Sequence, residues 1–276
     1  MLQDPEMNHE DAPDAPDSPL DPILDGRHKV LFVHGAALNG GMWHTAIGQF
    51  SPDYRCLAPD LPGHGAGRQG PFVLERAVDE LERSVAGLNS LSIVGESLGG
   101  YTAMVLAARL GSRVRSLVVS GASSNFGGMA YAPWFLQSAA SRALEAIMGP
   151  VRFEQAVKAK VQRSVPAPLA AAVLEGKLQL QAFHEAVAEL RRHDFKPDVA
   201  RIHAPILFVN GSRDRRQCWQ EPAFRAVALQ AESHRVPGAV HGVGLWQAER
   251  FADIARKFID RHCLISNPQI YSEEMP

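Results

Sequence analysis

The sequence has few cysteines and no long hydrophobic run. Its three cysteines, Cys56, Cys218 and Cys263, lie far apart and lack the paired spacing of zinc ligands. An odd number of scattered cysteines argues against a disulfide framework and is typical of a reducing compartment. No apolar run reaches the roughly 18 residues of a membrane-spanning helix, and the first residues lack the regions of a secretory signal. We therefore expect a cytoplasmic protein without a membrane partner.

Lysine and arginine are absent from the first 26 positions, which carry eight carboxylates and five prolines. Such a stretch has too little apolar surface to fold, so we predict that residues 1–26 form a disordered acidic tail. We assign residues 264–276 to a C-terminal tail. Between the tails stand 28 basic and 20 acidic side chains, in no basic block longer than a pair such as Arg191-Arg192. This excess is typical of a solvated surface and predicts no nucleic-acid partner.

Residues 95–99 have the pattern G-x-S-x-G, between a short apolar run and a stretch with helical spacing at residues 100–110. A strand, a tight turn and a helix form the context in which this pattern holds a nucleophilic serine. The turn forces Ser97 into a strained backbone conformation, which needs small neighbours such as Gly95 and Gly99. We predict that Ser97 is a nucleophile. The alternative is a glycine-rich turn with an incidental serine.

Apolar strands and amphipathic helices alternate along most of the chain, which predicts a mostly parallel central sheet with helices on both faces. The alternation stops between about residues 125 and 198, where the spacing of apolar residues is helical. We predict an inserted helical cap over residues 125–198, between core segments 27–124 and 199–263. The expected strands are residues 29–33, 56–58, 91–94, 116–120, 206–209 and 233–236, and two expected helices are residues 42–50 and 74–88.

Four motifs give this sequence a resemblance to the α/β-hydrolase superfamily. They are His34-Gly35, the run D-L-P-G-H-G at residues 60–65, the serine turn, and an aspartate and a histidine after the last two strands. The resemblance covers about residues 28–263. It implies an α/β-hydrolase fold with a cap between the family's sixth and seventh strands. Serine at the turn argues against haloalkane dehalogenases and epoxide hydrolases, which use an aspartate nucleophile.

The hydroxyl of Ser97 needs a base, and a histidine held by a carboxylate suits neutral pH. The resemblance implies that His241, in the loop before the last helix, is that base. It also implies that Asp214, after a strand and a glycine turn, orients the histidine. A surface histidine and a turn aspartate paired with a neighbouring arginine remain the alternatives. Relatives commonly have a proline soon after this aspartate; here Arg215-Arg216 follow, so either arginine could approach the site.

Further site residues are implied by the resemblance. The backbone N–H groups of Leu98 and Ala36 would form the oxyanion hole, and the small Ala36-Ala37 pair favours a branched or bulky acyl group. The apolar cap predicts an uncharged, hydrophobic substrate. The candidate pocket residues, which could equally be core residues, are Trp134, Phe126 and Met129.

Three other polar residues near these motifs are expected to have structural roles. His34 and His64 lie within turn motifs where the family's histidines are usually structural. The side chain of Glu96 should point away from Ser97 and make a structural contact, with tuning of a pKa in the site as the alternative.

We therefore expect a serine hydrolase that cleaves a small to medium hydrophobic carboxylic ester, thioester or lactone through an acyl-serine intermediate. The alternatives on the same triad are a carbon–carbon bond hydrolase, an acyltransferase or a perhydrolase, and a ligand-binding protein without catalysis is a third class. We expect no metal and no organic cofactor, a small hydrophobic acyl substrate as the partner, and a monomer or homodimer.

Overall fold

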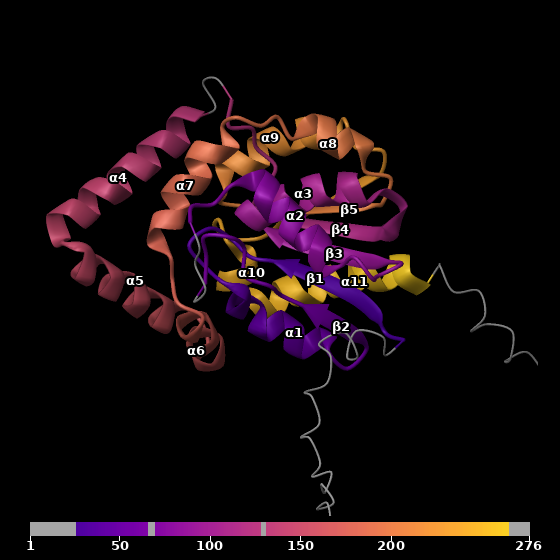
Figure 1. Cartoon of the computed structure of the whole chain (residues 1–276), viewed down its shortest axis with the longest axis horizontal. Helices are drawn as coiled ribbons and strands as arrows, with labels where there is room; N and C mark the ends of the chain where they lie inside the picture. Colours follow the sequence, from indigo (N-terminus) through magenta and orange to yellow (C-terminus); the bar gives the residue numbers. More distant parts are fainter. Residues whose placement is uncertain (1–25, 66–69, 128–130, 265–276) are drawn as a thin grey trace, which may run out of the picture.

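The computed structural model describes residues 26–65, 70–127 and 131–264. Within them, one six-stranded sheet with parallel neighbours lies at the centre (Figure 1). The mostly parallel α/β architecture is thus confirmed. The predicted tails, apart from Gly26 and Leu264, lie outside the described residues. In the order β2-β1-β3-β4-β5-β6, the strands are β1 (His28–Val33), β2 (Tyr54–Leu57), β3 (Leu91–Glu96), β4 (Val114–Ser120), β5 (Ile206–Gly211) and β6 (Ala231–Val236).

The carboxyl ends of the strands are aligned along one edge of the sheet. Val33 of β1 pairs with Gly95 of β3, Glu96 of β3 pairs with Ser120 of β4, and the last residues of β5 and β6 also pair. The central strand β3 is buried along its whole length, which explains why its sequence is mainly apolar and does not alternate. The loops that follow these strands therefore open onto one rim, where open α/β sheets bind ligands.

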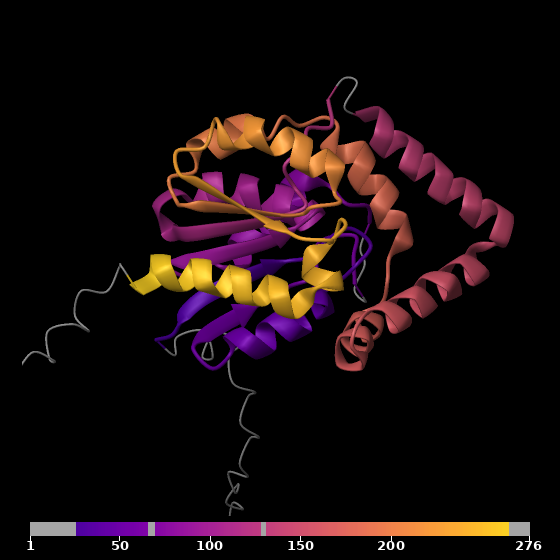
Figure 2. The same ribbon diagram turned by 180° about the vertical axis from the view of Figure 1, so that it is seen from behind.

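Helices cover both faces of the sheet. On one face α1 (His44–Phe50) packs against α11 (Ala248–Leu264), which is the long yellow helix in Figure 2. On the other face lie α2 (Leu74–Ser84), α3 (Leu98–Leu110) and α9 (Arg215–Arg225). Successive β1 residues face opposite sides, so the sheet separates two buried apolar clusters.

Two of the expected helices differ at one end. The helix expected from residue 42 starts as a 3₁₀ turn, η2 (Gly40–Trp43), before α1 begins. The helix expected over residues 74–88 ends at Ser84. Val85 and Leu88 are buried as predicted, but their carbonyl groups accept hydrogen bonds from the guanidinium group of Arg113. The long apolar spacing therefore reflects a buried turn as well as a helix.

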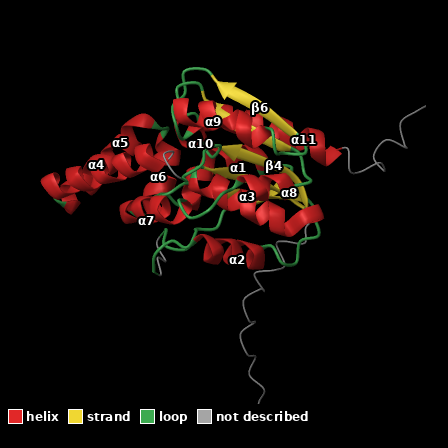
Figure 3. Cartoon of the chain, turned by 90° about the horizontal axis from the view of Figure 1, so that it is seen from above, coloured by secondary structure: helices red, strands yellow, loops and turns green. Residues whose placement is uncertain are grey.

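Between β4 and β5 the described residues form helices and no strand. The resemblance implied an insertion between the sixth and seventh strands in the family's own count; in this chain it lies between β4 and β5 of the six described strands. Helices α4 and α5 project from the body of the protein, and α7 runs back towards the sheet (Figures 1 and 3). The helices are α4 (Ala132–Met148), α5 (Pro150–Ser164), α6 (Ala167–Glu175), α7 (Leu180–Leu190) and α8 (Lys196–Arg201).

The loop after β1 anchors this helical insertion to the rim of the sheet. The side-chain amide of Asn39 donates hydrogen bonds to the carbonyl oxygens of Val173, at 2.8 Å, and Lys177, at 3.0 Å. The backbone N–H of Gln179 donates to the carbonyl oxygen of Ala37 at 3.0 Å. The insertion is therefore fixed beside the loop in which the oxyanion hole is expected. None of the described helices combines the length and apolar character needed to cross a membrane.

Candidate active site

Ser97 lies at the sharp turn between β3 and α3, with φ 52° and ψ −116°. A residue with a Cβ rarely adopts positive φ, so this position stores backbone strain. The surrounding structure holds the turn from both sides. The N–H of Ser97 donates to the carbonyl oxygen of Ser120 at 2.7 Å, and its own carbonyl accepts from the N–H of Tyr101 at 3.1 Å.

The glycines beside Ser97 are required by close backbone contacts. A Cβ on Gly99 would come within 2.1 Å of the carbonyl oxygen of Val33, and a Cβ on Gly95 within 2.5 Å of the carbonyl oxygen of Gly99. Neither glycine has positive φ. Small residues are therefore required here because the start of α3 packs directly against the end of β1 at Gly99 and against β3 at Gly95.

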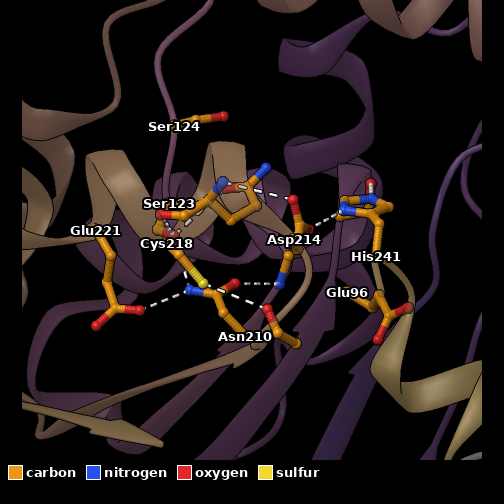
Figure 4. A network of polar contacts seen from close by, with 12 residues as sticks. Glu96, Ser123, Ser124, Asn210, Asp214, Cys218, Glu221 and His241 are labelled. Carbon is orange, nitrogen blue, oxygen red and sulfur yellow. Dashed lines mark hydrogen bonds and ion pairs between the residues drawn. The ribbon is translucent and has the colours of Figure 1, made fainter. Parts of the chain in front are cut away.

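Three residues that are distant in the sequence form one chain of hydrogen bonds on this rim. The Nε2 atom of His241 lies 2.9 Å from the Oγ atom of Ser97, and its Nδ1 atom lies 2.6 Å from the Oδ2 atom of Asp214 (Figure 4). Because a carboxylate accepts, Nδ1 carries a hydrogen and Nε2 is left to accept from the serine hydroxyl. The structure thus brings together all three residues expected at the centre of the site.

The loops that carry Asp214 and His241 are bonded to each other. The N–H of Arg213 donates to the carbonyl oxygen of Ala239 at 2.9 Å, next to the paired ends of β5 and β6. Asp214 also caps α9, where its side chain accepts a long hydrogen bond from the N–H of Gln217. The carboxylate position is therefore set by the sheet and by the start of α9.

The charges around His241 favour its protonated form. Burial acts to lower the pKa of His241, but the hydrogen bond and charge of Asp214 and the charge of Glu96 outweigh it, so the pKa is raised. Arg216 opposes this effect. Glu96 is 2% exposed, and burial raises the pKa of its carboxyl group. Its Oε2 atom accepts from the N–H of Gly244 at 2.7 Å, which is the structural contact expected from the sequence.

An apolar cavity of about 280 Å³ opens beside Ser97, and we call it the apolar chamber. The loop after β1, with Gly35, Ala36 and Ala37, forms one wall, and Ala37 has φ 66°. Ala36 lines the cavity, and within the described residues no backbone acceptor is found for the N–H groups of Ala36 and Leu98. The apolar part of the wall comes from α5, α7, α10 (Val243–Trp246) and nearby loops: Leu38, Val157, Val161, Leu178, Leu180, Phe183, Leu245 and Trp246.

A second cavity, of about 690 Å³, lies on another side of His241, and we call it the arginine chamber. Trp134 lines it, as predicted for a pocket wall. Phe126 does not line either chamber; it is 2% exposed and stacks on Trp134 with ring centroids 4.9 Å apart, so it supports the wall from behind. Met129, the third predicted pocket residue, lies outside the described residues. Among the described residues, the lining consists of Pro133, Trp134, Gln137, Arg213, Asp214, Arg215, Arg216, Trp219 and His241.

The arginines depart from the expectation of an uncharged pocket. The guanidinium carbon of Arg216 lies 4.1 Å from the ring centroid of Trp134, so the suggestion that an arginine approaches the site is correct. Trp219 also lines this chamber and is 79% exposed. In the sequence, arginines stand where relatives commonly have a proline, and this difference indicated that an arginine could approach the site. It did not indicate which wall of the site the arginines would line.

Sequence reasoning missed a buried polar network behind Asp214. The side chain of Asn210 accepts from the N–H of Gly121 at 3.2 Å and donates to the Oγ atom of Ser123 at 2.9 Å and to Glu221 at 2.8 Å (Figure 4). These contacts join the ends of β4 and β5 to α9. In the sequence, Asn210 is part of an Asn-Gly pair after an expected strand, which is typical of a turn. No local pattern therefore predicted that its side chain would join this network.

The other residues near the motifs have structural contacts. The Nε2 atom of His34 accepts from the N–H of Leu61 at 2.9 Å, and burial together with the nearby His64 lowers the pKa of His34 to about 3. Neutral His34 thus ties the end of β1 to the turn after β2. Among the described residues, no group of three or more histidine, cysteine and acidic side chains is arranged to hold a metal ion.

Relatives of this chain include esterases of similar length. It is 27% identical to a pimeloyl-(acyl-carrier protein) methyl ester esterase of Neisseria meningitidis, over 86% of this chain and 95% of that protein. A protein of the same name from Xanthomonas axonopodis is also 27% identical, over 87% of this chain and 98% of the relative.

Solved structures of low sequence identity share the fold. A study of carboxylesterases from Nitrososphaera gargenis includes a structure with a TM-score of 0.70 and 16% identity, covering 86% of this chain and 92% of that chain. The enol-lactonase from Burkholderia xenovorans has a TM-score of 0.67 and 18% identity, over 85% of this chain and 92% of the other. The model of the alpha/beta hydrolase family matches residues 30–254, which is most of the chain. This protein is therefore a member of the alpha/beta hydrolase family.

Proposed function

We propose that Ser97, His241 and Asp214 are the nucleophile, the general base and the orienting acid of a carboxylic-ester hydrolase. One observation carries this proposal: the unbroken series of hydrogen bonds from Ser97 through His241 to Asp214. The relatives named as esterases support the same reaction class. The alternatives considered from the sequence gain no support from these relatives.

In the first half of the reaction, the Oγ atom of Ser97 attacks the carbonyl carbon of the ester while Nε2 of His241 takes the hydroxyl proton. The carbonyl oxygen then carries a negative charge, which the backbone N–H groups of Ala36 and Leu98 would stabilise. When this intermediate collapses, the bond to the alcohol oxygen breaks, and His241 gives its proton to that oxygen. The products are an alcohol and an acyl-serine.

In the second half, water attacks the acyl-serine and gives a proton to His241. The second tetrahedral intermediate collapses, the ester oxygen of Ser97 regains a proton from His241, and a carboxylic acid is released. Asp214 stays ionised throughout and stabilises the imidazolium form of His241. Every proton is carried by His241, so the proposed chemistry needs only these side chains and water.

The apolar chamber supports a hydrophobic acyl group as the part of the substrate next to Ser97. Its aliphatic walls would gain free energy by covering apolar surface, about 25 cal/mol per Å². The named relatives act on a methyl ester of a pimeloyl group. We propose that this protein hydrolyses esters of small to medium aliphatic acyl groups, and also thioesters and lactones of the same size.

The test compares para-nitrophenyl esters of increasing acyl length with wild-type protein and Ser97→Ala. We expect wild-type turnover and loss of about 10⁵-fold or more in kcat for the variant, because the acyl-serine cannot form. Ser84→Ala, at the exposed end of α2, is the matched control and should keep wild-type kcat. Circular dichroism and thermal melting check that each variant is folded.

A covalent probe tests the roles of the histidine and the serine separately. A fluorophosphonate should modify Ser97 in the wild-type protein, as located by peptide mass spectrometry, and His241→Gln should slow this labelling strongly. His203→Gln, a change of an exposed histidine, should not. Hydrolysis that persists in folded Ser97→Ala, or labelling at a different residue, would refute the assignment.

A further inference from the structure

His241 lies between two cavities of different character. The apolar chamber contains Ser97 and the loop with Ala36, whereas the arginine chamber contains Trp134 and Arg216; His241 lines both. A substrate bound to Ser97 has two substituents on its reacting carbonyl group, the acyl chain and the alcohol or thiol. The apolar chamber can hold one of them, and the arginine chamber is the space beside His241 for the rest of the molecule.

The arginine chamber carries an excess of positive charge. Arg213, Arg215 and Arg216 contribute three guanidinium groups, and the only carboxylate in the lining is that of Asp214. Asp214 is already bonded to His241 at 2.6 Å. Among the described residues, no carboxylate forms an ion pair with any of these three arginines.

Several other arginines of this protein form ion pairs with carboxylates. Arg109 binds Glu75 at 2.5 Å and Asp79 at 2.6 Å, and Arg256 binds Asp53. The arginines of the chamber differ from these paired arginines, because their side chains line a cavity and form no such ion pair. An anion that enters this chamber would find donors that are free to bind it.

Arg216 is held in position before any ligand arrives. Its guanidinium group stacks over the ring of Trp134 at 4.1 Å, and Trp134 is 6% exposed with Phe126 stacked behind it. Partial burial lowers the pKa of Arg216, and the charge of Asp214 only partly offsets this effect. An added negative charge would thus stabilise a cation that has already lost part of its hydration.

The arginine chamber is also close to the reacting atoms. The ring centroids of Trp134 and His241 are 6.1 Å apart, and the charge of Arg216 acts on His241. Trp219, exposed on the chamber wall, adds a flat apolar surface. Resting on the esterase function proposed above, we propose that the arginine chamber binds a carboxylate or phosphate group of the substrate, with Arg216 as the principal contact.

The test uses pairs of esters that differ only in charge. On the alcohol side, para-butyryloxybenzoate is compared with the neutral para-butyryloxybenzamide, and para-butyryloxyphenyl phosphate distinguishes a phosphate from a carboxylate. On the acyl side, para-nitrophenyl hydrogen glutarate is compared with the neutral para-nitrophenyl glutaramate. The measured quantity is kcat/KM for the charged ester divided by kcat/KM for its neutral partner.

Arg216→Gln should reduce this ratio about tenfold in the pair whose charge enters the chamber, because a charge-assisted contact is lost. The loss should appear in KM for the charged ester, whereas the effect of the removed charge on the pKa of His241 acts on both esters of a pair and cancels in the ratio. Arg225→Gln, an exposed residue at the far end of the same helix, is the matched control and should leave the ratio as in the wild-type protein. Arg215→Gln, also exposed, provides a second variant if the loss of stacking on Trp134 unfolds Arg216→Gln.

The outcomes separate this inference from the esterase function. An arginine-dependent preference on either side supports the anion site and assigns the side that it serves. Hydrolysis of the neutral esters without such a preference in any pair overturns the anion site and leaves the esterase intact. Failure to hydrolyse any ester, neutral or charged, overturns the esterase function itself.

Discussion

The imidazole of His241 lies directly against the backbone of Gly121. A Cβ at position 121 would come within 2.9 Å of the Cε1 atom and 3.2 Å of the Nδ1 atom of His241. Gly121 follows β4 with φ +60°, and its N–H is bonded to the side chain of Asn210. The end of β4 therefore supplies no side chain to the site and instead forms the surface on which the ring rests.

Replacement of Gly121 by alanine should separate a backbone effect from a catalytic one. The positive φ alone should lower the free energy of unfolding by about 1–2 kcal/mol. The methyl group should also displace the imidazole from Ser97 and lower kcat by about 10–100-fold. Urea unfolding and ester hydrolysis measure the two effects.

Gly111→Ala is the matched control for this substitution. Gly111 has φ +57°, but nothing lies within 4 Å of the position that its Cβ would take. We expect a similar loss of stability with wild-type kcat. Equal kcat values in the two variants would show that Gly121 does not position His241.

Asn210 should stabilise the site from behind. It is 1% exposed, and its amide bonds Ser123, Glu221 and the backbone of Gly121. Asn210→Ala leaves these buried groups without their partner, so the free energy of unfolding should fall by about 2–3 kcal/mol. Asn89→Ala, an exposed change, should stay within about 0.5 kcal/mol of the wild-type value by the same urea titration.

Asp214→Asn should retain the fold and lose most of the activity. The neutral amide cannot stabilise the imidazolium form of His241 and can hold the ring with the wrong nitrogen protonated, so kcat should fall by about 10³–10⁴-fold. A second histidine–aspartate pair provides the control: His193 lies 2.5 Å from Asp198 at the start of α8. Asp198→Asn should leave kcat unchanged, and a comparable loss there would point to a general structural effect.

Ser97 could be predicted from its own sequence pattern, whereas Asp214 and His241 came from the resemblance to the α/β-hydrolase superfamily. All three residues follow strands. Ser97 follows β3, Asp214 follows β5 and His241 follows β6, and the carboxyl ends of parallel strands meet at one edge. The pattern of each strand is local in the sequence. Its consequence, that distant residues converge, follows from the parallel sheet alone.

The walls of the two chambers could not be predicted in this way. The stacking of Arg216 on Trp134 joins α9 to α4, and nothing in either segment specifies the other. The same limit explains Phe126, whose neighbourhood in the sequence suggested a pocket wall, whereas its ring packs behind Trp134. The spacing of apolar residues identifies helices, but the contacts between them depend on how the helices pack.

Glu96 should raise the pH above which the enzyme is active, because its charge raises the pKa of His241. Its charge helps to raise the pKa of His241, while Arg216 opposes it and Asp214 contributes the largest favourable effect. Because His241 must be neutral to accept the proton of Ser97, a raised pKa moves the acid limb of kcat/KM to higher pH than an ordinary histidine would give. Glu96→Gln removes the charge and keeps an acceptor for Gly244, so the limb should move to lower pH.

Glu221→Gln is the control for this shift, since Glu221 is a carboxylate that is also about 1% exposed but lies beyond Asn210. Its acid limb should coincide with that of the wild-type protein, even if its stability falls. The measurement is kcat/KM for a neutral ester across the pH range in which all three proteins remain folded. If the acid limb of the Glu96→Gln profile stays in place or moves to higher pH, the charge of Glu96 does not raise the pKa of His241. The role of Glu96 would then be its bond to Gly244.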